Sequence, residues 1–119
     1  MKRNIFLVVD DDEEQRELLR DVLEDFYSEE RVICATNGKE GLEKFEENLF
    51  SVKLVITDIN MPEMNGIDFT KMVKAASPET PVILTSGEPK PDENQADAFL
   101  PKPFNLRQLI QIIRKLTGQ

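Results

Sequence analysis

Three acidic residues of this sequence follow short apolar runs, at positions where buried strands would end. Asp10 and Asp11 come directly after the run Ile5–Val9, and Asp58 follows the run Leu54–Thr57. The carboxyl ends of parallel strands form the edge at which open α/β sheets bind ligands. If these two strands are neighbours, the three carboxylates converge and repel one another unless a cation neutralises them. An all-oxygen set of carboxylates without histidine or cysteine suits Mg²⁺, which keeps waters and accepts phosphate oxygens.

A hydroxyl and an ammonium group occupy the same kind of position later in the chain. Ser86 follows the apolar run Pro81–Thr85, and Lys102 follows Ala98–Leu100. Beside carboxylates and a divalent cation, these groups can contact phosphoryl oxygens while one carboxylate acts as the nucleophile. Each residue alone has a plainer explanation as an acidic helix start, a turn residue or a solvated lysine. The set of five on strand ends indicates a phosphoryl site.

The elements that would position these residues alternate along the chain. Apolar runs predict strands at 5–9, 31–35, 54–57, 81–85 and 98–100, and helical periodicity predicts helices near 13–26, 39–47, 67–76 and 106–116. Asp12 is expected to cap the first helix, with Gln15 completing a capping box. Alternation of this kind implies parallel pairing through right-handed crossovers. We therefore expect an α/β fold, a flavodoxin-like doubly wound five-stranded parallel sheet, and we assume the strand order 2-1-3-4-5.

Composition narrows the possible functions. A chain of 119 residues with 39% apolar and 32% charged residues predicts one globular domain, and no apolar run is long enough for a membrane helix. The net charge of −8 argues against a nucleic-acid surface. The single cysteine, Cys34, excludes an internal disulfide and suits a cytoplasmic location, and the short apolar run near the N-terminus does not fit a signal peptide. There are no histidines, which removes the usual zinc ligand and proton shuttle.

Five blocks of sequence, in order, resemble the receiver domain of two-component response regulators of the single-domain chemotaxis type. The blocks cover nearly the whole chain and read VVDDDEEQRELL, ATNGKEGLEKF, VITDINMPEMNG, PVILTSG and LPKPF. The resemblance implies that Asp58 accepts a phosphoryl group from the phosphohistidine of a sensor histidine kinase or a histidine phosphotransfer protein. It also implies a Mg²⁺ (or Mn²⁺) site formed by Asp58, by Asp11 directly, by Asp10 through water and by the backbone carbonyl of Asn60.

The same resemblance implies roles for the residues at the ends of the last two strands. Lys102 would pair with the phosphoryl group, and the Lys102–Pro103 peptide bond would be cis. Ser86, five positions after Pro81, would be the switch hydroxyl in place of the neighbouring Thr85. Gly87 fills the small-residue position that gives phosphate access. Phe99 takes the aromatic switch position, where it can signal only by burial because it lacks a hydroxyl.

Two further positions bear on how long the phosphoryl group lasts. In the family, the residues two past the phosphorylated aspartate and two past the switch hydroxyl set the rate of dephosphorylation. Here they are Asn60 and Glu88, the types found in fast-cycling chemotaxis regulators. We therefore expect a short-lived phosphoryl group on a protein that assists its own phosphorylation and dephosphorylation without turning over external substrates.

The chain departs from the family between the fourth and fifth strands. Lys102 follows Ser86 by only 16 positions, several fewer than in most receivers. We predict that Gly87–Ala96 lacks a full helix and is mobile, so the fourth helix is shortened or missing. In the family, the fourth helix, the fifth strand and the fifth helix form the surface that contacts output partners. Because the fourth helix is expected to be incomplete here, the resemblance does not predict this surface for the chain. With residues 1–119 forming a single receiver domain and no effector domain, we expect output through contact with an unknown downstream protein or through a phosphorelay.

Three alternatives remain open on the sequence. A receiver-like interaction module could keep the fold without phosphorylation. A haloacid-dehalogenase-like phosphatase also begins with an acidic D-x-D pattern, which Asp10 and Asp12 imitate, but Glu14 stands where that family has a hydroxyl or small apolar residue. A flavin- or nucleotide-binding protein fits less well, because the first strand–helix turn is acidic and holds neither glycine nor hydroxyl to cradle a phosphate.

Overall fold

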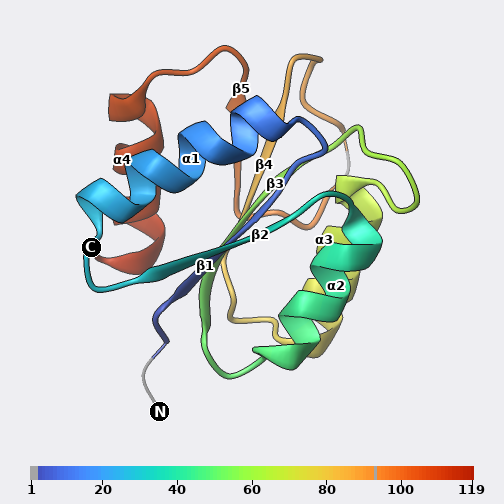
Figure 1. The fold of residues 1–119 in the computed structure, drawn as a ribbon. Coiled ribbons are helices and arrows are strands. Elements are labelled where there is room, and N and C mark those ends of the chain that lie inside the picture. Colours follow the sequence, from blue (N-terminus) through green and yellow to red (C-terminus); the bar gives the residue numbers. More distant parts are fainter. Residues whose placement is uncertain (1–2, 93) are drawn as a thin grey trace.

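The computed structural model describes residues 3–92 and 94–119, which form one parallel sheet covered by helices on both faces (Figure 1). The strands pair in the order β2-β1-β3-β4-β5, which confirms the flavodoxin-like arrangement assumed from the sequence. Their bounds are β1 Ile5–Val9, β2 Arg31–Ala35, β3 Val52–Asp58, β4 Val82–Ser86 and β5 Ala98–Pro101. The helices are α1 Glu13–Phe26, α2 Gly38–Glu47, α3 Gly66–Ala76 and α4 Leu106–Thr117.

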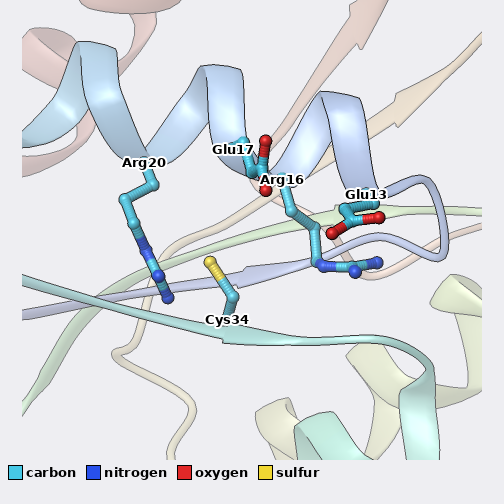
Figure 2. A pocket seen from close by; sticks show the side chains of 5 residues that line it. All are labelled: Glu13, Arg16, Glu17, Arg20 and Cys34. Atoms are coloured by element: carbon cyan, nitrogen blue, oxygen red, sulfur yellow. The ribbon is translucent and has the colours of Figure 1, made fainter.

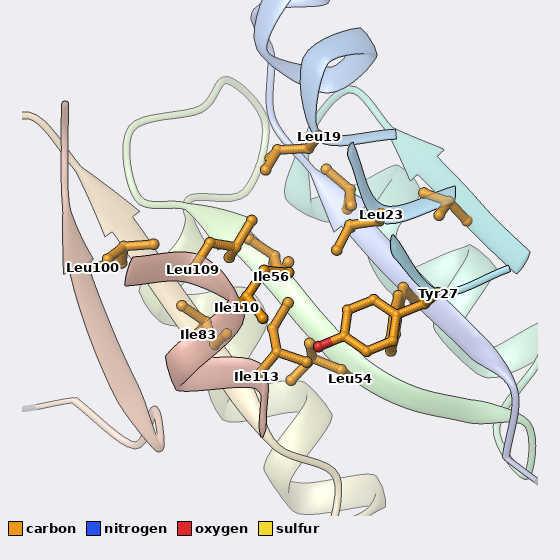
Figure 3. Packing of buried hydrophobic residues seen from close by; sticks show 13 residues of the cluster. Leu19, Leu23, Tyr27, Leu54, Ile56, Ile83, Leu100, Leu109, Ile110 and Ile113 are labelled. Atoms are coloured by element: carbon orange, nitrogen blue, oxygen red, sulfur yellow. The ribbon is translucent and has the colours of Figure 1, made fainter. Parts of the chain in front are cut away.

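Side chains on opposite faces of the sheet pack into two separate hydrophobic cores. On β1, Phe6 and Val8 belong to the core that α1 and α4 cover, whereas Leu7 and Val9 belong to the core under α2 and α3. This alternation follows from the two-residue period of a strand whose faces are both buried. Figure 3 shows the first core, in which side chains from α1, α4 and the central strands meet, among them Leu19, Leu23, Leu109 and Ile113. Both faces of the central strands are thus fixed.

Asparagine and aspartate side chains begin all four helices. The N-caps are Asp12, Asn37, Asn65 and Asn105, and each accepts a hydrogen bond from a backbone N–H in the first helical turn. Asp12 caps α1 as expected, but its carboxylate accepts from the N–H of Glu14, so the capping box predicted with Gln15 was wrong. A capping box does occur at α4, between Asn105 and Gln108.

Strand β3 is longer than the sequence pattern indicated. It begins at Val52 and includes Asp58, whereas the apolar run predicted only 54–57. Lys53 interrupts the apolar pattern, yet its ammonium group lies 2.7 Å from the carboxylate of Glu30, in the turn before β2. The strand continues through Lys53 because this partly buried charge has a partner.

The crossover from β4 to β5 contains no helix among the residues described there, 87–92 and 94–97, while Glu93 lies outside the described residues. This confirms the expected loss of the family's fourth helix, and α4 of this structure is therefore the closing helix. Asp97 anchors the end of the crossover. Its N–H donates to the carbonyl of Val82 (2.9 Å), and its carboxylate accepts from the N–H of Val82 (2.8 Å) and from Lys74 (2.6 Å). The mobility of this segment stays a prediction.

Candidate functional site

The three candidate carboxylates meet at the carboxyl edge of the sheet. Asp10 follows β1 directly and Asp58 is the last residue of β3, and these neighbouring strands are in register with Val9 opposite Thr57. One oxygen from each of Asp10, Asp11 and Asp58 lies within 4.8 Å of the others. Asp10 is buried, Asp58 is partly buried and Asp11 is exposed. The sequence prediction that these three acids converge is therefore supported by their geometry.

Lys102 brings a positive charge to the same place. Its Nζ lies 3.2 Å from Oδ2 of Asp10 and 3.6 Å from Oδ1 of Asp58. The residue follows β5, its N–H donates to the carbonyl of Ser86 (2.8 Å), and the Lys102–Pro103 bond is cis, as expected. One ammonium group thus contacts two of the three clustered carboxylates, and the described residues leave the cluster with excess negative charge.

Backbone groups hold the two inner carboxylates in place. Asp10 accepts a hydrogen bond from the N–H of Asp12 (2.9 Å), and Asp58 accepts one from the N–H of Ile59 (2.9 Å). Arg16, on the first turns of α1, donates to the carbonyl oxygen of Asp10 (2.7 Å). Each carboxylate keeps oxygen lone pairs that these contacts do not use, so both are able to accept further donors or a cation.

Burial raises the pKa of the Asp58 carboxyl above its usual value. The negative charges of Asp10 and Asp11 raise this pKa further, while Lys102 and the N–H of Ile59 oppose the rise. The net upward direction means that the ionised form of Asp58 is destabilised by its surroundings. A cation at this place would relieve that destabilisation.

Two glycines hold the loop that follows Asp58, a role that the sequence reading missed. A Cβ on Gly66 would lie 2.0 Å from the carbonyl oxygen of Asp58, and the Gly66 N–H donates to the carbonyl of Ile59 (2.8 Å). A Cβ on Gly38 would lie 2.3 Å from the carbonyl oxygen of Met64, to which the Gly38 N–H donates (3.0 Å). The signal was present in the sequence, because both glycines follow an asparagine that caps a helix.

The predicted switch residues line the neighbouring strand ends. Ser86 is the last residue of β4, one position beyond Thr85, which pairs with Asp58. The buried Ser86 hydroxyl accepts from the N–H of Glu88 (2.9 Å), whereas the buried Thr85 hydroxyl donates to the backbone carbonyl of Thr57 (3.4 Å). This difference favours Ser86 over Thr85, as does the position of Ser86 five residues after Pro81. Phe99 pairs in register with Leu84 and is half-buried.

The remaining predicted positions lie on exposed loops beside the site. Asn60, Gly87 and Glu88 are all exposed. A Cβ on Gly87 would meet no atom within 4 Å, so the protein itself does not require a glycine there. Asp12 does not join the three carboxylates of the cluster, and its side chain caps α1 instead.

A separate small pocket of about 160 Å³ lies between α1 and β2 (Figure 2). Arg16 and Arg20 reach from α1 toward Cys34 on β2, and two glutamates of α1, Glu13 and Glu17, complete the lining. None of the three clustered carboxylates lines it. The pocket is therefore distinct from the carboxylate site, and its mixed charges select no class of ligand.

Similarity to known proteins shows which family has this fold and this cluster of carboxylates. A family model for the response regulator receiver domain matches residues 6–114. The chain belongs to the response regulator receiver family. Receiver domains are signalling modules of two-component systems rather than classical substrate-turnover enzymes, so the phosphatase alternative finds no support. They generally bind Mg²⁺ at an acidic pocket and interact with histidine kinases or phosphotransfer proteins and with downstream partners.

Individual relatives agree with this assignment. The receiver domain is 39% identical over 119 residues to the transcriptional regulatory protein CpxR of Escherichia coli (strain K12), covering 95% of this chain and 49% of CpxR. The chain thus spans about half the length of that relative. It is 33% identical over 122 residues to the response regulator receiver protein CpdR of Brucella abortus (strain 2308), covering 98% of this chain and 97% of CpdR.

A solved structure is similar in fold as well as sequence. It is the response regulator TrrA from Thermotoga maritima in complex with Mg²⁺ and BeF, with a TM-score of 0.86 and 31% identity over 95% of this chain and 98% of that one. Among the described residues of this receiver domain, no helix is long and apolar enough to cross a membrane.

Proposed function

We propose that this receiver domain is a phospho-acceptor in which Asp58 takes a phosphoryl group from the phosphohistidine of a sensor histidine kinase or a phosphotransfer protein. The observation that carries the proposal is the meeting of Asp58 with two other carboxylates and with Lys102 at one edge of the sheet. In the transfer, an Asp58 carboxylate oxygen bonds to phosphorus and the phosphorus–nitrogen bond breaks. The imidazole of the donor keeps that electron pair and takes up a proton.

The donor set fits a hard divalent cation. Asp10, Asp11 and Asp58 offer oxygens within 4.8 Å of one another, and the sequence holds no histidine that would favour a softer metal. These three residues, with the backbone carbonyl of Asn60, would hold Mg²⁺ or Mn²⁺. When bound, the cation supplies charge neutralisation for the carboxylates and for the phosphoryl oxygens. The raised pKa of Asp58 supports this proposal, because the site destabilises uncompensated negative charge.

Lys102 and Ser86 are the residues that we propose to sense the phosphoryl group. The Lys102 ammonium already lies 3.6 Å from Asp58, so it is placed to pair with added negative charge. The Ser86 hydroxyl is free to rotate its proton toward a new acceptor while it still accepts from the N–H of Glu88. Gly87, beside Ser86, presents no side chain that would block access to the carboxylate. Phe99, half-buried on the adjacent strand, would report the movement by a change in burial.

Nuclear magnetic resonance with Mg²⁺ and beryllofluoride, a phosphoryl mimic, tests the proposal. We expect backbone resonances around Ser86 and Phe99 to shift in the wild type and to stay unchanged in Asp58→Asn. Asp12→Asn is the matched control, because it makes the same chemical change two residues from Asp10 while keeping a good N-cap. It should respond as the wild type does.

Two outcomes would count against the proposal in different ways. An equal response in Asp58→Asn would show that Asp58 is not the acceptor. A wild type that binds Mg²⁺ and beryllofluoride without any shift around Ser86 and Phe99 would remove the switch and favour an interaction module without a phosphorylation signal. We propose that the phosphorylated domain signals in the cytoplasm, either by binding a downstream protein or by passing the phosphoryl group on in a phosphorelay. Capturing the protein that binds the phosphorylated form would distinguish the two.

A further inference from the structure

The two aspartates that follow β1 are held in different ways. Asp10 is anchored through its backbone and its side chain: its N–H donates to the carbonyl of Ala35 (3.1 Å), and its carboxylate accepts from the N–H of Asp12 (2.9 Å). The ammonium group of Lys102 adds an ion pair to the same carboxylate (3.2 Å). The carboxylate of Asp11 is exposed, and within the part of the chain that the structure describes it takes part in no hydrogen bond or ion pair. Its place in the cluster is therefore set by the backbone that carries it.

One peptide group determines where the Asp11 side chain lies. The carbonyl oxygen of Asp10 and the N–H of Asp11 belong to the same planar peptide unit, so fixing that oxygen fixes the direction in which the chain continues into Asp11. Arg16 fixes it, because its Nη1 donates to the Asp10 carbonyl oxygen at 2.7 Å. A charged donor makes a hydrogen bond roughly twice as strong as a neutral one. Arg16 thus acts on the one acid of the cluster whose side chain has no contact of its own among the described residues.

Helix α1 holds Arg16 in position for this contact. The N–H of Arg16 donates to the carbonyl of Asp12 (3.0 Å), and the N–H of Asp12 donates to the Asp10 carboxylate (2.9 Å). Together with the guanidinium contact, these hydrogen bonds close a ring from Asp10 through Asp12 and Arg16 back to Asp10. Figure 2 shows the Arg16 side chain directed toward the start of α1, whereas the Arg20 side chain lies beside Cys34. The contact with the turn after β1 therefore belongs to Arg16 and not to the arginine one turn later.

The charge of Arg16 would by itself work against a cation. A guanidinium group beside the carboxylates repels a divalent cation, so its Coulomb energy opposes binding. Glu13 and Glu17 line the same pocket as Arg16 and offset part of that charge. A benefit to the cation site must therefore come from the hydrogen bond to the Asp10 carbonyl. The two effects of Arg16 have opposite signs and can be separated by experiment.

We propose that Arg16 is a positioning residue of the cation site, which orients the peptide between Asp10 and Asp11 so that the Asp11 carboxylate meets the other two. The inference rests on the proposed function, because it takes the three clustered carboxylates as the ligands of Mg²⁺ or Mn²⁺. The guanidinium contacts a backbone oxygen rather than a carboxylate, so it acts through the orientation of the ligand. Removing a group that orients a metal ligand typically lowers metal affinity by about 10–100-fold.

Titration with Mg²⁺ at constant ionic strength, followed by nuclear magnetic resonance, measures the effect. Arg16→Met removes the donor and the charge but keeps a long, unbranched side chain that favours a helix. We expect the dissociation constant for Mg²⁺ to rise roughly tenfold or more. Loss of the charge alone would lower that constant, so the direction of the change distinguishes positioning from electrostatics.

Arg16→Lys is the conservative variant that should restore part of the affinity. Lysine keeps the positive charge and can donate to the same carbonyl, but it has a shorter side chain and no planar guanidinium. The affinity for Mg²⁺ should therefore lie between those of the wild type and Arg16→Met. A purely electrostatic role predicts another order, in which Arg16→Lys equals the wild type and Arg16→Met binds more tightly than both.

Arg20→Met is the matched control. It removes the same chemical group from the same side of α1, because Arg20 lies four residues after Arg16 and lines the same pocket. Arg20 makes no hydrogen bond or ion pair within residues 3–92 and 94–119. We expect its dissociation constant for Mg²⁺ to stay close to the wild-type value. Circular dichroism should show that all variants are folded.

The metal-free protein gives a second readout that does not depend on Mg²⁺. In Arg16→Met the peptide between Asp10 and Asp11 loses its partner, so the N–H of Asp12, which donates to the Asp10 carboxylate, should exchange with solvent faster than in the wild type. Arg20→Met should leave that exchange rate unchanged.

The possible outcomes separate this inference from the proposed function. If the wild type binds Mg²⁺ and Arg16→Met binds it equally well or more tightly, Arg16 does not position the site, while the cation site itself stands. Equal losses of affinity in Arg16→Met and Arg20→Met would also overturn the inference. A wild type without Mg²⁺-dependent shifts around the carboxylates removes the cation site, and the inference falls with it.

Discussion

Among glycine-to-alanine substitutions near the site, Gly66→Ala should disturb the site most. Gly66 is the first residue of α3 and lies against the backbone of the loop that leaves Asp58. A Cβ at this position would lie 2.0 Å from the Asp58 carbonyl oxygen, 2.9 Å from its carbonyl carbon and 3.0 Å from the Cα of Ile59. All three neighbours are backbone atoms, so no side chain can rotate away to make room.

The size of the effect follows from that geometry. The loop or the helix must move by about 1 Å before the closest approach becomes tolerable, and overpacking of this kind costs about 1–3 kcal/mol. Alanine recovers at most about 1 kcal/mol, through helix propensity and a less flexible unfolded chain. Because the closest approach is only 2.0 Å, the cost lies near the upper end of that range, and the net loss is about 2 kcal/mol. With a typical dependence on urea of about 1–3 kcal/mol per M, the unfolding midpoint should fall by roughly 0.7–2 M.

The same displacement should also slow phosphorylation. A shift of about 1 Å at a reacting group can cost on the order of 100-fold in rate. The assay is the rate at which a small acyl phosphate labels the protein in the presence of Mg²⁺, measured beside urea unfolding. Gly87→Ala is the stability control, since its added Cβ meets no atom within 4 Å. If Gly66→Ala were as stable as Gly87→Ala and were labelled at the wild-type rate, the steric reasoning would be wrong.

Other predictions address charge, burial and lifetime. In metal-free buffer Asp58→Asn should be more stable than the wild type at neutral pH, because burial and neighbouring acids raise the pKa of Asp58 in the folded state. At pH values between the pKa of Asp58 in the unfolded state and its higher pKa in the folded state, the folded state binds more protons. The stability of the wild type therefore falls as the pH rises through that window. Urea unfolding at several pH values should show that the variant is more stable at neutral pH and loses this advantage in acid. Added Mg²⁺ should stabilise the wild type more than the variant, and equal stabilisation would argue against a metal site at Asp58. Tyr27→Phe should leave the stability unchanged or raise it, because the buried Tyr27 hydroxyl has no hydrogen-bond partner among the described residues, and a loss above about 1 kcal/mol would contradict this. With Asn60 and Glu88 at the two rate-setting positions, a phosphoryl group should decay quickly in a time course with labelled phosphate, and persistence for hours would refute that expectation.

Much of the fold was predictable because the sequence shows both the continuous apolar runs of buried strands and the helical spacing of apolar residues. The runs 5–9 and 31–35 coincide with β1 and β2, and α1 begins and ends where the helical pattern placed it. Errors of one or two residues arose where a polar residue continues an element, as at Lys53 in β3. The sequence alone did not contain the strand order, because pairing across the sheet depends on which crossovers fit together in space.

The candidate site was predictable to the extent that it lies on strand ends. Asp10, Asp58 and Lys102 meet because parallel strands finish at one edge, a rule that needs no side-chain detail. The contacts that hold the loop after Asp58 were missed. Their cause is close approach between Gly66 or Gly38 and distant backbone, and periodicity carries no information about such approaches.

The lost helix and the retained site are compatible because different parts of the chain support them. The inner carboxylates are fixed by the ends of β1 and β3, by Arg16 and by the glycine contacts, none of which involves the crossover from β4 to β5. The crossover itself is tied at its far end, where Asp97 joins Lys74 and Val82. At its near end, Ser86 is held both by its place in β4 and by the N–H of Lys102. Shortening the crossover therefore changes the surface beside the site and leaves the strand ends in register, so the proposed chemistry does not require the family's fourth helix.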